Sequence, residues 1–114
     1  MAKTSAVELA ALVVDAAAEL GLEGAQDGDG MAYSVGTTLV VYVAGATAEF
    51  RLRADVAAAA ARTAEAGPSP RGPEWVAFSP TTFDRFTRDR IASWCEFAAK
   101  QARARKPGRE SSGP

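Results

Sequence analysis

Two short turns, each led by glycine, most constrain how this chain can fold. Gly36-Thr37 and Gly45-Ala46 each separate two stretches rich in β-branched and aromatic residues. Glycine at the first of two loop residues is typical of a type II′ turn, which joins adjacent antiparallel strands. The pattern therefore predicts a three-stranded antiparallel meander over residues 31–35, 38–43 and 47–53.

Counting outward from these turns divides the strand residues into two faces, because side chains alternate along a strand. The apolar face, which we expect to pack on the core, holds Ala32, Leu39, Val41, Val43, Ala48, Phe50 and Leu52. The mixed face holds Tyr33, Val40, Tyr42, Glu49, Arg51 and Arg53. Arginine beside tyrosine is typical of surfaces on which bases stack, but arginine stems also cover aromatic rings on ordinary exposed sheets. Both interpretations of the mixed face stay open.

Three helices and a fourth strand are predicted around the meander. Residues 5–21 form an Ala- and Leu-rich helical pattern that ends at Gly21, and Asp55 can cap a helix that runs to about Ala66. Residues 24–30 and 67–73 have loop compositions, and residues 74–79 a strand composition. The last helix, 81–105, is expected to take Ser79 as its cap and Pro80 in its first turn. Its apolar stripe consists of Phe83, Phe86, Ile91, Trp94, Phe97, Ala98 and Ala102.

Together these elements predict one α+β domain over residues 1–106, followed by a polar, disordered tail over 107–114. An antiparallel sheet of about four strands should be packed by the N-terminal, middle and long C-terminal helices. The core side chains expected to be nearly inaccessible are Val41, Phe50, Leu52, Trp94 and Phe97.

The composition argues against most catalytic and metal sites. The chain has no histidine and a single cysteine, which excludes His-based triads, disulfide frameworks and most zinc sites. Cys95 lies in a helical pattern among apolar residues, so we expect a buried structural thiol. Asp27 and Asp29 resemble the start of a calcium loop, but Thr38 stands where the bidentate glutamate belongs. We therefore expect no catalytic residue, no metal and no cofactor, in a cytoplasmic protein without a membrane segment.

The N-terminal helix carries its acidic residues Glu8, Asp15 and Glu19 on one narrow stripe, and apolar residues occupy most of the remainder. Two arrangements would bury so wide an apolar surface. The helix at 56–66 could cover it within the monomer, or a second copy could cover it in a homodimer formed through residues 5–21.

Clustered cations suggest nucleic acid as another partner, although the net charge of the chain is only -1. Cations in the last turn of a helix also complement its dipole, so part of this cluster has a structural explanation. The candidate DNA-binding residues are Tyr42, Arg51, Arg53, Lys100, Arg103, Arg105 and Lys106.

The segment from Ala32 to Ala102 resembles the MmcQ/YjbR-like family, and the N-terminal domain of TfoX-like regulators is the second match. The most specific part is the run from Gly67 to Phe78, in which a Pro/Ser/Gly loop leads into a Trp-Val strand before the C-terminal helix. The resemblance implies a compact α+β domain of the kind described as a double-wing DNA-binding protein. It supplies no catalytic residues.

Three functional hypotheses follow. The first is a non-enzymatic protein of MmcQ/YjbR type with weak, sequence-independent DNA binding. The second is a protein-interaction module or homodimer without nucleic-acid binding. The third is a small-ligand binder that uses the mixed sheet face or the proline-rich loop.

Overall fold

The structure, a computed structural model, describes residues 2–105 and the side chains of residues 6–104. These residues form three helices and six strands, and all six strands belong to a single sheet. The elements in chain order are α1 (Ala2–Leu20), β1 (Glu23–Asp27), β2 (Gly30–Val35), β3 (Thr38–Ala44), β4 (Thr47–Arg51), α2 (Ala54–Ala60), β5 (Ala66–Pro68), β6 (Trp75–Phe78) and α3 (Arg85–Arg105).

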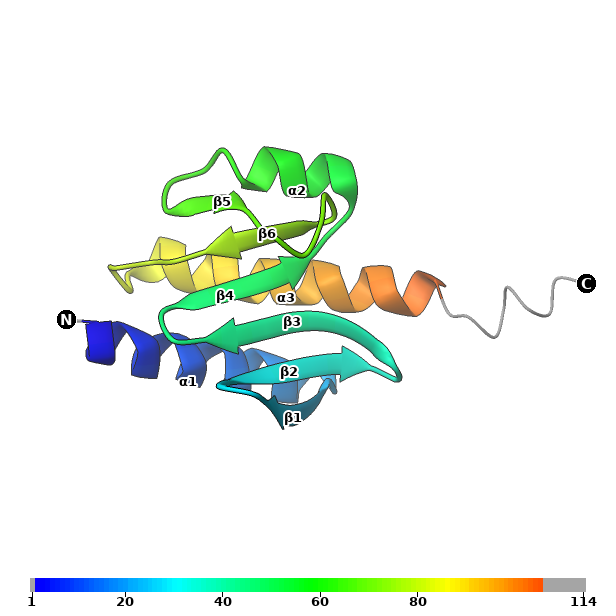
Figure 1. The fold of residues 1–114 in the computed structure, drawn as a ribbon, viewed down its shortest axis with the longest axis horizontal. Helices are drawn as coiled ribbons and strands as arrows, with labels where there is room; N and C mark the ends of the chain where they lie inside the picture. Colours follow the sequence, from blue (N-terminus) through cyan, green and yellow to red (C-terminus); the bar gives the residue numbers. More distant parts are fainter. Residues whose placement is uncertain (1, 106–114) are drawn as a thin grey trace, which may run out of the picture.

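The sheet is antiparallel throughout and has the strand order β1-β2-β3-β4-β6-β5. Helices α1 and α3 pack against each other and cover the same face of the sheet, behind the strands in Figure 1. Helix α2 contacts β5 and β6 at the far edge. No helix of the described residues covers the opposite sheet face, which we call the outer face. The predicted α+β class is confirmed, with six strands rather than about four.

Both glycine-led hairpin turns form as predicted. Residues 36–37 and 45–46 are two-residue loops between paired strands, and Gly36 and Gly45 have φ angles of 60° and 58°. Glycine adopts positive φ without steric cost, so these turns are encoded locally. The pairing of Tyr42 with Glu49 across β3 and β4 follows directly from the second turn.

A β-bulge changes the predicted register between β2 and β3. Tyr33 pairs with Val41 and Ser34 pairs with Leu39, so Val40 is an extra residue on β3. A bulge of this kind rotates the side chains beyond it to the other face. Tyr33 and Val40 are therefore buried, and Ala32 lies opposite Tyr42 on the outer face. The predicted faces of these three residues were wrong.

The two edge strands lie mostly in the stretches expected to be loops, residues 24–30 and 67–73, but Ala66 of β5 was expected to end the middle helix. Strand β1 starts at Glu23, and its five residues are all exposed. It has no β-branched or aromatic residue, and its order comes from pairing with β2. Strand β5 is three residues long and pairs with β6 through a segment containing Pro68, a residue typical of edge strands.

The starts of α2 and α3 also differ from the predictions. Arg53, not Asp55, occupies the N-cap of α2, and the helix ends early because residues 66–68 pair with β6. Helix α3 starts at Arg85, where Asp84 Oδ1 accepts a hydrogen bond of 3.0 Å from the Thr87 backbone N–H. The predicted cap, Ser79, instead forms a hydrogen bond through its hydroxyl with the hydroxyl of Thr47, the first residue of β4, at 2.8 Å.

The core lies between the sheet and the pair α1–α3. Val41, Phe50 and Leu52 are fully inaccessible, as predicted. Trp94 contacts the rings of Phe50 and Phe78 edge-on, with centroid distances of 5.6 and 5.3 Å. Trp94 is nevertheless only partly buried, because one side of α3 faces solvent.

Two further aromatic residues of α3 depart from the prediction. Phe97 is partly buried rather than inaccessible, and Phe86 is 77% exposed. Both lie toward the solvent side of a helix that has only one side on the sheet. The apolar stripe on α3 is therefore narrower than the sequence pattern indicates, and Cys95 contributes to it.

Candidate functional site

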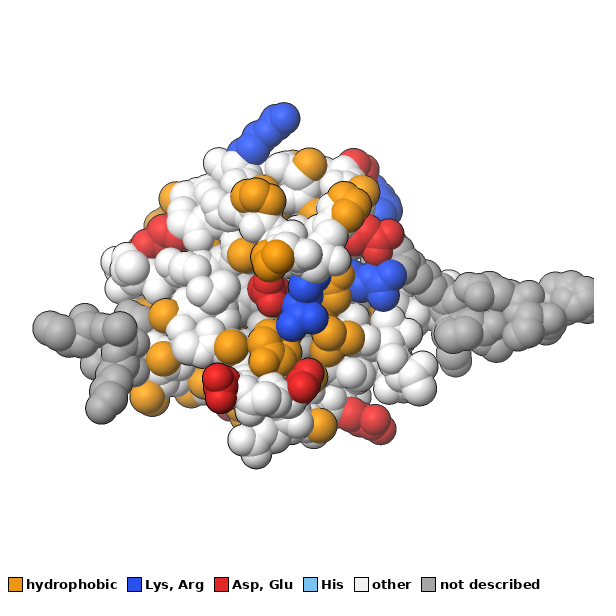
Figure 2. All heavy atoms as spheres, viewed as in Figure 1, with side chains coloured by type: hydrophobic (Ala, Val, Ile, Leu, Met, Phe, Trp, Pro, Cys, Tyr) orange, Lys and Arg blue, Asp and Glu red, His pale blue; other side chains and the backbone are white. Residues whose placement is uncertain are grey.

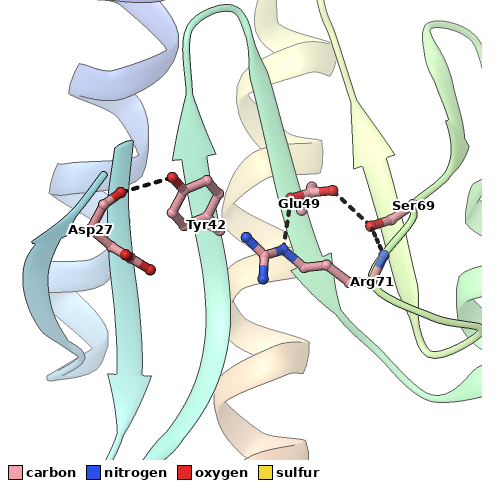
Figure 3. A network of polar contacts seen from close by, with 5 residues as sticks. All are labelled: Asp27, Tyr42, Glu49, Ser69 and Arg71. Atoms are coloured by element: carbon pink, nitrogen blue, oxygen red, sulfur yellow. Dashed lines mark hydrogen bonds and ion pairs between the residues drawn. The ribbon is translucent and has the colours of Figure 1, made fainter. Parts of the chain in front are cut away.

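Arg71 lies at the centre of a polar network on the outer face of the sheet. Its Nε donates a 2.8 Å hydrogen bond to Glu49 on β4, and the other carboxylate oxygen of Glu49 accepts one of 2.7 Å from Ser69 (Figure 3). The guanidinium carbon lies 4.5 Å from the centre of the Tyr42 ring and 5.3 Å from that of Trp75. The network attaches the proline-rich loop between β5 and β6 to the sheet.

Tyr42 is fixed at its other end. Its hydroxyl donates a 2.9 Å hydrogen bond to the backbone oxygen of Asp27 at the end of β1 (Figure 3). Gly30 makes this crossing possible, since a Cβ at that position would collide with the Tyr42 hydroxyl and the Val43 backbone oxygen. The outer face is therefore held by side chains that bond to one another. Arg71 was not among the residues predicted for the mixed face, because it reaches this face from the loop between β5 and β6.

Most of the predicted DNA-binding cations form ion pairs or hydrogen bonds within the chain. Arg51 contacts Glu74 at 3.0 Å, Arg53 contacts Asp55 at 2.9 Å, and Lys100 contacts Glu96 at 3.2 Å. Arg53 holds the pKa of Asp55 down at about 2.

Arg103 donates a 2.6 Å hydrogen bond to the Leu20 backbone oxygen, at the C-terminal end of α1. The Arg105 side chain and Lys106 lie outside the described residues. On the face in Figure 2, Lys and Arg occur singly among acidic and neutral groups rather than as one continuous basic area.

The described residues include potential metal ligands and one free cysteine, Cys95. No group of three or more potential metal ligands occurs among them. Cys95 is fully buried, as predicted, and burial raises the pKa of its thiol to about 12. A thiol that stays protonated near neutral pH is a weak nucleophile. Burial, with a smaller effect of Cys95, also raises the pKa of Tyr33.

A groove of about 300 Å³ runs beside the N-terminal half of α1. One wall is formed by Ala6, Ala10 and Val14 of this helix, and apolar residues of β2 and β3 line the floor. The β1–β2 and β3–β4 turns border it, at the end of the sheet beside the start of α1 (Figure 1). The floor residues are Met31, Tyr33 and Val43.

An apolar stripe on α1 continues from this groove onto the exposed helix surface. Val7, Ala11, Val14 and Ala18 are all exposed, with Val7 at 69% and Val14 at 48%. Helix α2 packs at the opposite edge of the sheet and does not cover them. Val13 is instead fully buried against the core. The wide apolar surface predicted for the N-terminal helix is therefore only partly used within the monomer.

The distribution of charge along the sequence also points to the region of the groove. Between Thr4 and Phe50 the chain has seven acidic residues and no Lys or Arg, while 12 of its 13 Lys and Arg residues follow Phe50. The acidic part comprises α1 and the first strands, which form the groove. Among the described residues that line the groove there is no cation.

Comparison with protein-family models, with curated protein sequences and with solved structures gives no match. The resemblance to the MmcQ/YjbR-like family therefore stays a prediction. Within the described part of the chain, no helix is long and apolar enough to cross a membrane.

Proposed function

We propose that this protein is a non-enzymatic protein-interaction module, and that the groove beside α1 docks an apolar segment of a partner protein. The observation that carries the proposal is the exposed apolar surface on α1, where Val7 and Val14 adjoin a groove of about 300 Å³. Apolar surface that is exposed beside a cavity is typical of binding sites for other proteins.

The alternatives have less support from the described residues. DNA affinity depends on cations that are free to contact phosphates, and Arg51, Arg53 and Lys100 are each paired with a carboxylate. A small-ligand site on the outer sheet face would have to displace the Arg71–Glu49 network, whose side chains already satisfy one another.

A selection from a displayed library of peptides tests the proposal. Selected peptides should share apolar residues and shift the NMR signals of Val14, Met31 and Val43. Val14→Gln should weaken their binding roughly tenfold, since a buried valine contributes about 1.5 kcal/mol. Ala58→Gln, on the exposed side of α2, is the matched control and should bind like the parent. Failure to select any peptide, or equal binding to the Val14→Gln variant, would refute the proposal.

Two other partners predicted from the sequence can be tested with the same protein. Sedimentation equilibrium at micromolar concentration separates an 11.8 kDa monomer from a homodimer formed through α1. A gel shift with generic duplex DNA across a salt series tests weak DNA binding, which should weaken with salt and with charge reversal at Arg103 and Arg105.

A further inference from the structure

We infer that the groove beside α1 binds an amphipathic helix whose apolar stripe is flanked by Lys and Arg. This inference rests on the proposed protein-binding function and specifies the chemistry of the partner. Two features support it: acidic side chains lie on both sides of the apolar surface, and the spacing of its exposed residues suits a helix.

Acidic residues border the apolar surface along both of its long sides. On α1 the stripe of Glu8, Asp15 and Glu19 runs next to the exposed apolar stripe. On the strand side Asp29, in the turn between β1 and β2, lines the groove. Like charges on both sides repel an acidic partner and attract a basic one, and this sets specificity and association rate.

Among the residues whose side chains the structure describes, Arg88 and Arg103 approach α1, and both lie away from the groove. Arg88 of α3 lines a separate depression together with Asp15 and Glu19. Arg103 reaches the opposite end of α1, where it bonds to the Leu20 backbone oxygen. Arg88 therefore offsets part of the acidic stripe on α1, whereas the described residues that line the groove itself include Asp29 and no cation.

The spacing of the exposed apolar residues favours a helical partner. Val7, Ala11, Val14 and Ala18 follow one another at intervals of four, three and four residues. This is the interval at which two helices pack along a common seam. The two alanines are small enough to let a second helix approach closely, while Val14 and the groove accept a larger side chain.

Two occupants supplied by the protein itself fit less well. A second copy packed antiparallel through α1 would bring the acidic stripes of the two helices together, which is repulsive. Residues 106–114 contain two cations but no large apolar side chain, so they could not fill an apolar groove. The charge and shape of the surface therefore favour a basic helix from another protein.

Synthetic peptides of about five helical turns, with leucine at the seam positions, provide the test. One peptide carries Lys and Arg beside the seam, a second carries Glu at the same positions, and a third has the composition of the first without an apolar face. Fluorescence anisotropy measures binding of each peptide at low salt and at about 1 M salt, where the Debye length is about 3 Å.

The basic amphipathic peptide should bind about tenfold more tightly than the acidic one at low salt, from the sum of a few exposed ion pairs. This preference should disappear at high salt and reverse in the double variant Asp15→Lys, Asp29→Lys. Val14→Gln should weaken binding of the basic peptide, whereas Ala58→Gln should not.

The contrary results distinguish failure of the basic-helix inference from failure of the proposed docking groove. Equal binding of the basic and acidic peptides, with loss in Val14→Gln, would refute the basic partner but leave the proposed docking groove intact. Equal binding of the peptide without an apolar face would reduce the effect to general charge attraction and overturn the inference. Binding that is unchanged in Val14→Gln would refute both the inference and the proposed function. Absence of binding by the basic peptide would overturn the inference, and the library selection would then test the groove separately.

Discussion

Of the side chains on α3, Trp94 should contribute most to the free energy of unfolding through its contacts with the sheet. It contacts both Phe50 and Phe78 edge-on, and the guanidinium of Arg90 lies over its ring at 5.6 Å. Replacement of a core tryptophan by alanine costs about 3–5 kcal/mol, and each aromatic pair contributes about 0.5–1.5 kcal/mol of such a loss. Because Trp94 is only partly buried, we expect Trp94→Ala to cost about 3 kcal/mol.

Urea denaturation followed by far-ultraviolet circular dichroism measures this loss, and Trp75 remains as a fluorescent probe. Trp94→Phe should retain more than half of the lost stability, because a smaller ring can still contact Phe50 and Phe78. Phe86→Ala is the matched control on the same helix: Phe86 is 77% exposed, so its loss should change stability by less than about 0.5 kcal/mol. A cost below about 1 kcal/mol for Trp94→Ala, or an equal cost for Phe86→Ala, would refute this packing argument.

Three further predictions concern polar groups. The pKa of the Cys95 thiol is raised to about 12 by burial, so an aromatic disulfide reagent at pH 8 should react with it only after denaturant is added; rapid reaction in native buffer would contradict this burial. Glu49→Ala and Arg71→Ala should each destabilise the protein, and a double-mutant cycle should give a coupling of about 1 kcal/mol for this partly buried pair; no coupling would mean that the loop is held by its prolines alone. The Thr87 backbone N–H holds the pKa of Asp84 below its ordinary value, so this carboxylate stabilises the fold above about pH 4 and the effect is lost as pH falls through the lowered pKa. Asp84→Ala should therefore lower the melting temperature at neutral pH but not in acid, whereas a constant difference would argue against the cap.

The proposed groove illustrates why candidate sites are harder to derive from a sequence than folds. The wide apolar surface of the N-terminal helix was evident from its residues, and exposed Val7 and Val14 agree with the expectation that some of it needs a partner. Which residues stay exposed could not be derived, because α1 is oriented by its contacts with α3 and the sheet. Val13 is buried and Val14 is exposed, although they are adjacent and identical in type.

Arg71 shows the same limit on the outer face of the sheet. The loop between β5 and β6 was identified as stiff from its prolines, but nothing in its sequence indicates that Arg71 would lie between Tyr42 and Trp75. Trp75 is four residues from Arg71, but Tyr42 is 29 positions away in the chain, so the sequence does not indicate this contact.

Two cations near the C-terminal end of the sequence, Lys100 and Arg103, lie among the residues whose side chains the structure describes. The i,i+4 spacing of Glu96 and Lys100 makes their ion pair predictable from the sequence, whereas the hydrogen bond from Arg103 to the Leu20 backbone oxygen is not.

Features that depend on neighbouring residues follow from the residue pattern alone. The glycine-led turns place β2, β3 and β4 in a meander because only glycine adopts the required φ without strain, and the apolar periodicity of α3 places Ile91, Cys95 and Ala98 in the core. Other features depend on residues that are distant in the chain and become neighbours only in the fold. Strand β1 forms because the edge of β2 is free to pair with it. The bulge at Val40 turns the Tyr33 side chain into the core, where burial of the ring outweighs the loss of regular strand pairing. The end of α2 and the start of α3 also depend on distant residues. Residues 66–68 pair with β6, and Glu65 accepts hydrogen bonds from the backbone N–H groups of Ser79 and Thr81. These contacts satisfy backbone groups that a longer helix would otherwise have to satisfy.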